Sequence, residues 1–397
     1  MNRPESAQLL PARVPGLVLC VLAMRITPVP AQTLSEVDAA VRQGIRQGIY
    51  PGAVVVIGRR DSVLYARGYG HFTWKTASPV PTPDSTIWDI ASITKVVGTA
   101  SAAMRLVDIG RLSLDAPVRN YLPRFAGGPK DRVRVRMLLD HTSGMRAYAP
   151  LFKTARTREA AIALVYSEPL VREPGDRPLY SDLNAILLGL LLEEVSGMAL
   201  ERLVEREVFE PLELRQTTFR PPAAVHRRTV PTALWRGHPV QGQVNDPNAV
   251  VLGGAAGHAG IFSTGMDLAR YAQVWLRNGV SPRGRWVSPA TLRRFLERGT
   301  NSGPRLLGWD TAEHGGKEPS VFGTLISDAG YGHTGFTGTE LWIDPARDLF
   351  LVFLTNRTFN PRPRNSQHAL RRVRASLSDA AIRLVPYTCE QELVAQC

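Results

Sequence analysis

The N-terminal part of the chain carries a helix-like pattern followed by a strand-like one. Apolar residues recur at helical spacing over residues 33–48, which predicts an amphipathic helix. After the turn at 50–52, two β-rich runs at 53–59 and 62–70 are separated by two polar residues. Two such runs joined by a two-residue turn predict a β-hairpin.

The C-terminal part of the chain repeats the strand-like pattern. Residues 331–334, 338–343 and 349–355 alternate or run apolar, and the segment 344–348 forms a turn before the last run. These runs predict antiparallel strands joined by short turns, and the helical spacing at 367–384 predicts a closing helix. We therefore expect the two ends of the chain to share one antiparallel sheet.

The middle of the chain is patterned as helices between Pro- and Gly-rich turns, and no strand is required there. The predicted helices cover residues 93–109, 133–139, 157–167, 182–196 and 200–207. We predict an α/β fold of the α+β type, in which residues 32–90 and 252–385 form a lobe with a central antiparallel sheet flanked by the terminal helices. Residues 91–251 are expected to form a mainly helical lobe, and residues 386–397 a C-terminal tail.

The composition is that of a globular protein with a strongly basic charge. The 397 residues are 44% hydrophobic and 21% charged, which excludes a disordered or fibrous chain. The net charge of +13 makes nucleic acid a partner to consider. However, the arginines are scattered and often stand next to acidic residues, without the basic run interleaved with aromatics that a nucleic-acid binder requires. No nucleic-acid partner is therefore expected.

The first residues are patterned as an export signal. Two arginines precede an apolar run at 14–24, and small residues precede a cleavage site after Ala31. Residues 1–31 are therefore expected to be a signal peptide of a secreted or periplasmic protein. The run is too short to span a bilayer, so no stable membrane anchor is expected. Cys389 and Cys397 remain in the mature chain, either as a small terminal disulfide or as two free thiols.

Ser92 and Lys95 form a Ser-x-x-Lys motif at the start of a predicted helix. Residues three apart lie on one helix face, so the Lys95 amine can reach the Ser92 hydroxyl, and the N–H groups at a helix start point outward. A nucleophile, a candidate base and one oxyanion donor are thereby placed together. Of the five lysines, only Lys95 has a serine three positions before it. The structural alternative is a capping serine beside a solvated lysine.

Tyr180 and Asp182 form a Tyr-x-Asp motif at the start of another predicted helix. A tyrosine acts as a base only if a nearby cation lowers its pKa from about 10, and Lys95 could supply that charge. The structural alternative is an aromatic plug beside an N-cap aspartate.

His333, Thr334 and Gly335 form a third motif, in a Gly-rich strand segment. Glycines on a strand let a substrate lie along the backbone, and a cationic side chain beside a hydroxyl can receive a carboxylate. The structural alternative is a Gly-rich bend with a surface histidine.

Other site motifs are absent from the sequence. It contains no Gly-x-Ser-x-Gly elbow, His-Glu-x-x-His, nucleotide-binding glycine loop or zinc-spaced cysteine pair, so metal and nucleotide sites lack their usual support. His141 and His258 lie in Gly/Ser-rich turns, where we favour histidines that satisfy loop backbone groups over catalytic ones.

The order Ser-x-x-Lys, Tyr-x-Asx, basic-Thr-Gly resembles that of the beta-lactamase-related serine hydrolases. This family contains class C beta-lactamases, D-alanyl-D-alanine carboxypeptidases, D-aminopeptidases and esterases. The likeness covers about residues 35–385 and includes the stretches 110–118, 137–145, 209–212 and 257–264. It implies a beta-lactamase/transpeptidase-like fold with the active site between the two lobes. It also implies an acyl-enzyme hydrolase without metal or organic cofactor.

The resemblance assigns roles by matching position. Ser92 would be the nucleophile, and Lys95 and Tyr180 its proton-transfer partners. The substrate-binding residues would be Asp182, His333, Thr334, Gly335 and Phe336, with His333 and Thr334 on the carboxylate-facing side of the cleft. The backbone N–H groups of Ser92 and Phe336 would form the oxyanion hole.

Two positions depart from many beta-lactamases of this family, which have asparagine at 182 and lysine at 333. A carboxylate at 182 close to Lys95 is expected to keep the amine protonated, which assigns the base role to Tyr180. A histidine at 333 is charged mainly below about pH 6.5, so its hold on a substrate carboxylate is weaker at neutral pH. Efficient antibiotic hydrolysis is therefore not expected.

The favoured function is a serine hydrolase that forms an acyl-enzyme on Ser92 and cleaves a small ester, an amide or a D-amino-acid peptide. The turns at 243–249 and 257–260 resemble those of carboxypeptidase-like penicillin-binding proteins, which makes a peptidoglycan-derived peptide a serious candidate. Two alternatives remain open. One is a beta-lactamase proper, and the other is a non-catalytic protein whose basic surface binds an acidic polymer such as the cell wall.

Overall fold

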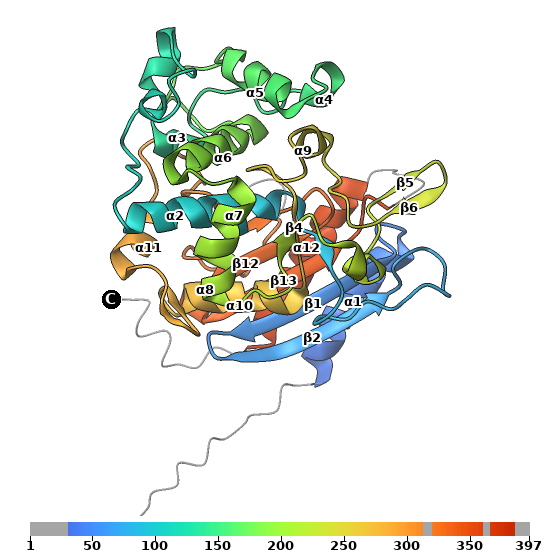
Figure 1. Cartoon of the computed structure of the whole chain (residues 1–397). Coiled ribbons are helices and arrows are strands. Elements are labelled where there is room, and N and C mark those ends of the chain that lie inside the picture. Colours follow the sequence, from blue (N-terminus) through green and yellow to red (C-terminus); the bar gives the residue numbers. More distant parts are fainter. Residues whose placement is uncertain (1–30, 313–319, 360–365, 386–397) are drawn as a thin grey trace, which may run out of the picture.

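The computed structural model describes residues 31–312, 320–359 and 366–385. Its centre is a six-stranded antiparallel sheet in the order β10-β11-β12-β13-β1-β2 (Figure 1). The strands are β1 (Gly52–Arg59), β2 (Ser62–Gly70), β10 (Asp310–Thr311), β11 (Tyr331–Thr334), β12 (Glu340–Asp344) and β13 (Leu349–Thr355). The hairpin strand β1 pairs with β13, with Ala53 opposite Thr355. The prediction that the two chain ends share one sheet is therefore confirmed.

Both faces of this sheet are covered by helices. On β1, Ala53, Val55 and Ile57 belong to the core beneath α1 (Ala31–Arg46) and α12 (Ser366–Arg383). Their neighbours Val54 and Val56 point the other way, into a larger core that includes α10 (Gly265–Leu276). Side chains alternate between the two faces of a strand. Because both faces are buried, the strand is a continuous apolar run rather than an alternating one.

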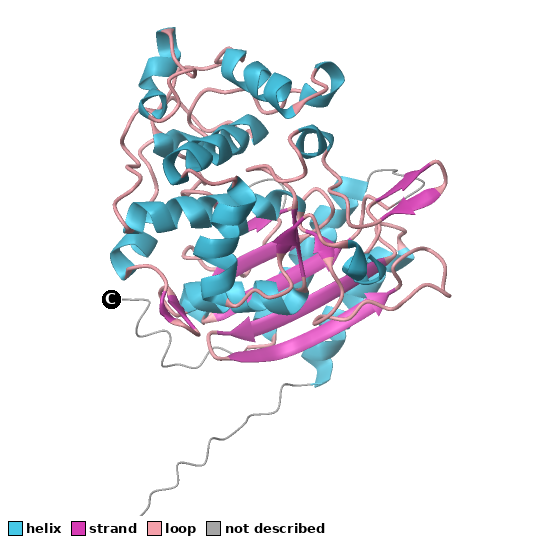
Figure 2. Ribbon diagram, in the orientation of Figure 1, coloured by secondary structure: helices cyan, strands magenta, loops and turns pink. Residues whose placement is uncertain are grey.

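The other helices lie beside one face of the sheet and beyond it (Figure 2). They are α2 (Ser101–Asp108), η3 (Val118–Asn120), η4 (Gly128–Arg132), α3 (Val135–Leu139), α4 (Leu151–Thr154), α5 (Arg158–Ser167), α6 (Asp182–Ser196), α7 (Leu200–Val204), η5 (Glu205–Phe209), α8 (Glu210–Leu212), η6 (Ala223–Arg228), α9 (Pro247–Val251) and α11 (Pro289–Phe295). The bounds of α6 are those predicted, because the Ser181 hydroxyl caps its start and Gly197, at φ 70°, ends it. The larger core continues from the sheet into these helices.

Short strands occur where the sequence predicted helices alone. Between residues 91 and 251 the structure contains β4 (Thr218–Phe219), β5 (Ala233–Trp235) and β6 (His238–Val240). The prediction that no strand lies there was wrong. Strands of two or three residues are too short to show a period of two, and their pairing depends on distant partners.

One of these short strands belongs to a three-stranded sheet that holds the segment before Ser92. The sheet has the order β3-β7-β4, where β3 is Trp88–Asp89 and β7 is Ile261–Ser263. A separate hairpin is formed by β8 (Val280–Ser281) and β9 (Gly284–Arg285). Pairing with β7 places the segment that leads into Ser92 beside the 257–260 turn.

Several sequence predictions fall outside the described residues. Residues 1–30 of the predicted signal peptide lie outside the described residues, and Ala31 begins α1. Cys389 and Cys397 also lie outside the described residues. The lobe boundaries at 90/91 and 251/252 stay predictions. Within the described residues no single helix is long and apolar enough to cross a membrane. Two helical segments, Asp182–Ser196 and Leu200–Leu212, reach the length and apolar composition of a membrane span only when they are counted together, and a 76° bend separates them.

Candidate active site

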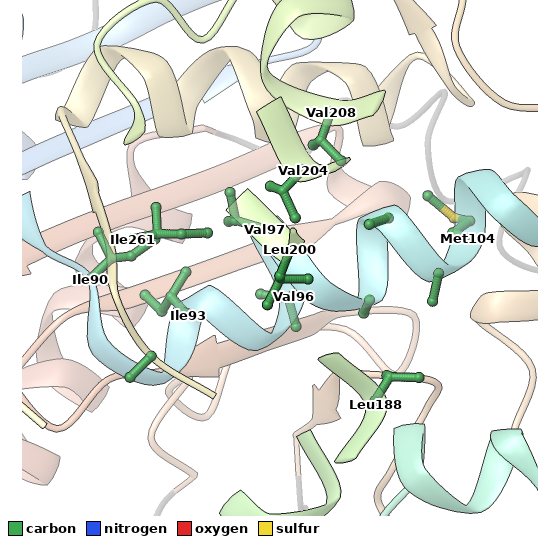
Figure 3. Close-up of a cluster of buried hydrophobic side chains, with 14 of the residues drawn as sticks. Ile90, Ile93, Val96, Val97, Met104, Leu188, Leu200, Val204, Val208 and Ile261 are labelled. Atoms are coloured by element: carbon green, nitrogen blue, oxygen red, sulfur yellow. The ribbon is translucent and has the colours of Figure 1, made fainter. Parts of the chain in front are cut away.

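The segment that carries Ser92 runs through the middle of the larger core. It consists of η1 (Ala91–Ile93), the π-helical η2 (Lys95–Ala100) and then α2, where one regular helix was predicted. Departures from regular helix geometry of this kind are frequent at functional sites. Apolar side chains of the segment, including Ile93, Val96 and Val97, belong to the same buried cluster as Ile90, Leu200, Val204 and Ile261 (Figure 3). The segment is therefore held rigidly on all sides.

Ala91, the residue before Ser92, has a left-handed backbone conformation with φ 48°. Such a conformation is strained for a residue with a Cβ atom. The carboxylate of Asp89 holds it in place, because its Oδ1 accepts the Ala91 N–H at 2.9 Å and its Oδ2 accepts the Asn245 N–H at 2.7 Å. Burial raises the pKa of Asp89 to about 6, although these two hydrogen bonds favour the ionised form. Asp89 thus fixes the turn from which Ser92 projects.

The Lys95 ammonium joins the predicted nucleophile to the predicted carboxylate. Its Nζ lies 2.9 Å from the Ser92 Oγ, 2.8 Å from the Asp182 Oδ1 and 3.3 Å from the carbonyl oxygen of His258. Burial alone would lower the pKa of Lys95, but Tyr180 and Asp182 outweigh it and the pKa is raised. Lys95 is therefore an ammonium at neutral pH, as the carboxylate at 182 predicted. In this state it donates a hydrogen bond to Ser92 rather than accepting its proton.

Tyr180 completes this cluster. Lys95 Nζ lies 4.9 Å from the centre of its ring. Burial raises the pKa of Tyr180, Lys95 lowers it and Asp182 raises it, and the net shift is upward. The cation that a tyrosine base requires is therefore present, but it does not bring the phenol below its ordinary pKa. The base role of Tyr180 stays a prediction, and at neutral pH the resting Lys95–Tyr180 pair holds both protons.

His333 is buried, which strengthens the expectation that it carries little charge at neutral pH, and its place on the carboxylate-facing side of the cleft stays a prediction. Burial, followed by the charges of Lys95 and Arg305, lowers its pKa well below 6.5. Its Nδ1 donates to the carbonyl oxygen of Thr334 at 2.8 Å, since that oxygen can only accept. The Nε2 therefore carries a lone pair, and it is buried without a hydrogen-bond partner among the described residues. The sequence showed the histidine but not the burial that decides its charge.

Arg305 brings a guanidinium group to the same cavity as His333, and sequence reasoning missed it. Its guanidinium lies 4.9 Å from the ring centre of Tyr180, on a side chain that is 18% exposed, and it forms an ion pair with Asp310. It lines the same cavity as Ser92. No spacing rule separates Arg305 from the many other arginines, so only its position in the fold identifies it.

The turn between β11 and β12 brings Phe336 next to the Ser92 segment. The Thr337 hydroxyl donates to the Asp89 carbonyl oxygen at 2.8 Å, and the Thr339 hydroxyl donates to the Ile90 carbonyl oxygen at 3.1 Å. The Phe336 N–H makes no hydrogen bond within the described part of the chain. Two threonines thus join the two segments whose N–H groups were predicted to form the oxyanion hole. That assignment is compatible with the geometry and stays a prediction.

A cavity of about 740 Å³ lies over these groups. It is lined by Ser92, Tyr180, Asp182, Asp246, Arg305, His333, Thr334, Gly335 and Phe336, among others. Phe336 is 57% exposed and Tyr148, another lining residue, is 45% exposed. The structure therefore brings all eight predicted site residues to one place, with Lys95 beneath the cavity floor. A nucleophile, two proton-transfer groups and a free backbone N–H around an accessible cavity suit acyl transfer.

The two loop histidines differ in their roles. The Nδ1 of His141 accepts the Ser181 N–H at 3.2 Å, which confirms the predicted backbone role, and its ring packs 4.8 Å from that of Tyr180. His258 instead bonds through Nε2 to the Asp246 carboxylate at 2.9 Å, so its predicted backbone role was wrong. Its carbonyl oxygen, rather than its ring, serves the site by accepting from Lys95.

Replacement of Asp182 by asparagine is expected to make the protein more active at low pH. Asp182 raises the pKa of both Lys95 and Tyr180, so its removal lowers both, and the pair loses its proton at lower pH. If the pair accepts the proton of Ser92, the acidic limb of the kcat/KM profile moves to lower pH. We expect activity at pH 6, relative to the alkaline plateau, to rise about threefold to tenfold.

The measurement is a pH series of ester turnover for the wild type, D182N and D176N. Asp176 is an exposed aspartate in the loop before Tyr180, with a side chain that is 57% exposed, and serves as the matched control. An unchanged or alkaline-shifted limb in D182N would contradict the assignment of the Lys95–Tyr180 pair.

Comparison with known proteins gives a consistent set of relatives. The sequence matches the Beta-lactamase family over residues 37–376. It is 29% identical over 370 residues to an Escherichia coli (strain K12) protein named "Putative D-alanyl-D-alanine carboxypeptidase", with 83% of each chain covered.

Two solved structures are similar in fold. A hydrolase with promiscuous acyltransferase activity gives a TM-score of 0.68 at 23% identity, over 88% of this chain and 99% of its own. A penicillin-binding protein homologue from Caulobacter crescentus gives a TM-score of 0.67 at 22% identity, over 89% of this chain and 98% of its own.

Proposed function

Because the chain belongs to the beta-lactamase family, we propose that it is a serine hydrolase that works through an acyl-enzyme on Ser92. The observation that carries this proposal is the position of the Lys95 Nζ, 2.9 Å from the Ser92 Oγ and 2.8 Å from the Asp182 carboxylate, beneath a substrate-sized cavity. Such an arrangement places a nucleophile within reach of a proton-transfer group that a third residue orients.

The reactive form is the one in which the Lys95–Tyr180 pair has lost one proton. Ser92 Oγ then attacks the substrate carbonyl carbon while its proton passes to the pair. The N–H groups of Ser92 and Phe336 donate to the oxyanion that forms. The leaving group takes the proton from the pair and departs, and the acyl group stays on Ser92. Water attacks the acyl-enzyme, its proton passes to the pair, and Ser92 is reprotonated as the acid product leaves.

The proposed substrate is a small ester, an amide or a D-amino-acid peptide, with a peptidoglycan-derived peptide first among them. The named E. coli relative supports the peptide. The Arg305 cation in the cavity suits a substrate that carries a carboxylate. With His333 neutral, a substrate carboxylate, including that of a beta-lactam, would have to be received by Arg305, and beta-lactam hydrolysis stays the alternative that the penicillin probe below tests. We also propose export to the periplasm or outside the cell, where such a peptide is found.

The test is intact-mass analysis of the full protein after exposure to fluorescent penicillin and, separately, to p-nitrophenyl butyrate. We expect an adduct or an ester burst in the wild type and none in S92A. S113A, at an exposed serine, is the matched control and should behave as the wild type. Persistent trapping of penicillin with slow release favours the peptidase, and rapid release favours a beta-lactamase. No adduct and no turnover with either probe would refute the hydrolase.

A further inference from the structure

A buried arginine contacts the turn that carries Phe336, and it also lines the cavity. Arg374, on α12, is only 7% exposed. Its Nη2 donates to the carbonyl oxygen of Gly335 at 3.1 Å and to that of Thr339 at 2.7 Å. These two carbonyls lie at the two ends of the turn between β11 and β12, where the Gly335 N–H also donates to the Thr339 carbonyl oxygen at 2.8 Å. One charged side chain thus bridges the two ends of the turn.

We propose that Arg374 is a positioning residue for the oxyanion hole, acting through the Gly335–Phe336 peptide. The Gly335 carbonyl and the Phe336 N–H belong to the same planar peptide unit. A hydrogen bond that fixes the direction of the carbonyl therefore fixes the direction of the N–H. The bond is charge-assisted, so it also draws electron density toward the carbonyl oxygen and makes the N–H a stronger donor. This inference rests on the proposed function, in which the Phe336 N–H stabilises the oxyanion.

The next peptide of the turn is held by a second arginine. Arg357 donates to the Phe336 carbonyl oxygen through Nε at 3.0 Å and through Nη2 at 2.5 Å. Its guanidinium also lies 4.6 Å from the centre of the Phe336 ring. The peptide units on both sides of the Phe336 Cα are therefore each fixed at their carbonyl. The Phe336 N–H belongs to the first of these two peptides and makes no hydrogen bond among the described residues, and Phe336 itself is exposed.

The charge of Arg374 has an unusual setting. Burial lowers its pKa to about 10, while Glu340 acts in the opposite direction. Glu340 is fully buried on β12, opposite Thr334, and its carboxylate has no hydrogen-bond partner among the described residues. Burial raises the pKa of Glu340 to about 8, so near neutral pH its carboxyl group is mostly protonated and Arg374 is the buried charge of the two. Burying a charge without an ionised partner in contact is costly, and an apolar residue of similar size often stabilises a fold more. A role of Arg374 in orienting the turn between β11 and β12 explains this arrangement, whereas a contribution to stability alone does not.

The test compares four variants with p-nitrophenyl butyrate as substrate and phenylboronic acid as ligand. R374K keeps the charge and one donor. R374M combined with E340Q removes both buried ionisable groups, so no carboxyl group is left without its neighbouring cation, and E340Q alone is measured beside it. R372M, at an exposed arginine on the same helix, is the matched control. Thermal unfolding is measured for all of them, so that a loss of folded protein is seen as such.

We expect the kcat of R374M/E340Q to be about 10- to 100-fold lower than that of E340Q, and the two KM values to agree within about threefold. The kcat of R374K should lie between those of these two variants. The affinity for phenylboronic acid, whose tetrahedral adduct on Ser92 places an oxygen in the hole, should fall by a similar factor. The ester carries no carboxylate, so a direct role of Arg374 as a substrate ligand predicts no loss with this probe. Unchanged kcat and boronate affinity in folded R374M/E340Q would overturn the proposal.

The proposed function is tested separately, by comparing ester hydrolysis in the wild type and S92A. If the wild type and S92A hydrolyse the ester equally, the hydrolase assignment fails. If the wild type nevertheless binds phenylboronic acid and S92A does not, the boronate affinity of R374M/E340Q still tests the role of Arg374, because it requires no turnover.

Discussion

Replacement of Lys95 by methionine is expected to lower kcat/KM for ester hydrolysis by about 10³-fold. Lys95 contacts both Ser92 and Asp182. Its charge also lowers the pKa of Tyr180, against burial and the Asp182 carboxylate. Without it the phenol is harder to ionise, so Tyr180, the group that remains, accepts the Ser92 proton less readily near neutral pH. Methionine retains most of the side-chain volume in this buried position, so the fold is expected to survive.

The measurement is steady-state turnover of p-nitrophenyl butyrate, with thermal unfolding recorded in parallel. K75M is the matched control, because Lys75 is exposed in the loop that follows β2 and lies outside the cavity lining. A folded K95M protein that retains more than a tenth of wild-type kcat/KM would contradict the assigned role of Lys95.

Replacement of Gly335 by alanine is expected to lower kcat/KM by about 10²- to 10³-fold, mainly through kcat. A Cβ atom at this position would lie 2.1 Å from the Thr339 Oγ1 and 2.7 Å from the Ile90 carbonyl oxygen. These are the two atoms whose hydrogen bond joins the turn to the Ser92 segment. Since neither can move without breaking that bond, the turn must shift and take the Phe336 N–H away from Ser92.

The control for this variant is G299A. Gly299 also has ordinary backbone angles, but a Cβ atom there would meet its nearest neighbour, the Asp140 Oδ2, at 3.4 Å, which is normal contact. We expect G299A to retain wild-type kinetics. If G335A did the same in a folded protein, the Phe336 N–H would have to be replaced as an oxyanion donor in the proposed mechanism.

The regular elements were largely predictable because their signals are local. The helix α6 has the predicted bounds, since a capping serine and a terminal glycine flank it in the sequence. The strands β11 and β13 also match, because turns interrupt their apolar runs on both sides. The short strands β4, β5 and β6 were missed, because nothing within two or three residues distinguishes a strand from a loop. The segment after Ser92 was predicted as one regular helix, but tertiary packing divides it into three helical forms.

The candidate site was predictable where chemistry and spacing coincide. Ser92 with Lys95, and Tyr180 with Asp182, stand at spacings that place reactive groups together, and the structure brings the two pairs into one cluster. Arg305 and Arg374 could not be found in this way. Each is one arginine among many, and its importance comes from a ring or a carbonyl contributed by a distant segment.

The amino-acid sequence was enough to establish the sheet shared by the two chain ends and the set of reactive side chains. Hydrophobic period, caps and motif spacing are properties of neighbouring residues, so they can be recognised without the fold. The protonated state of Lys95 was expected from the carboxylate at 182, whereas the extent of the pKa shifts in the site was decided by tertiary structure. His333 is neutral and Lys95 charged because burial and cations or carboxylates from distant segments set their pKa values. A pKa depends on everything within a few ångströms in space, and that neighbourhood exists only after folding.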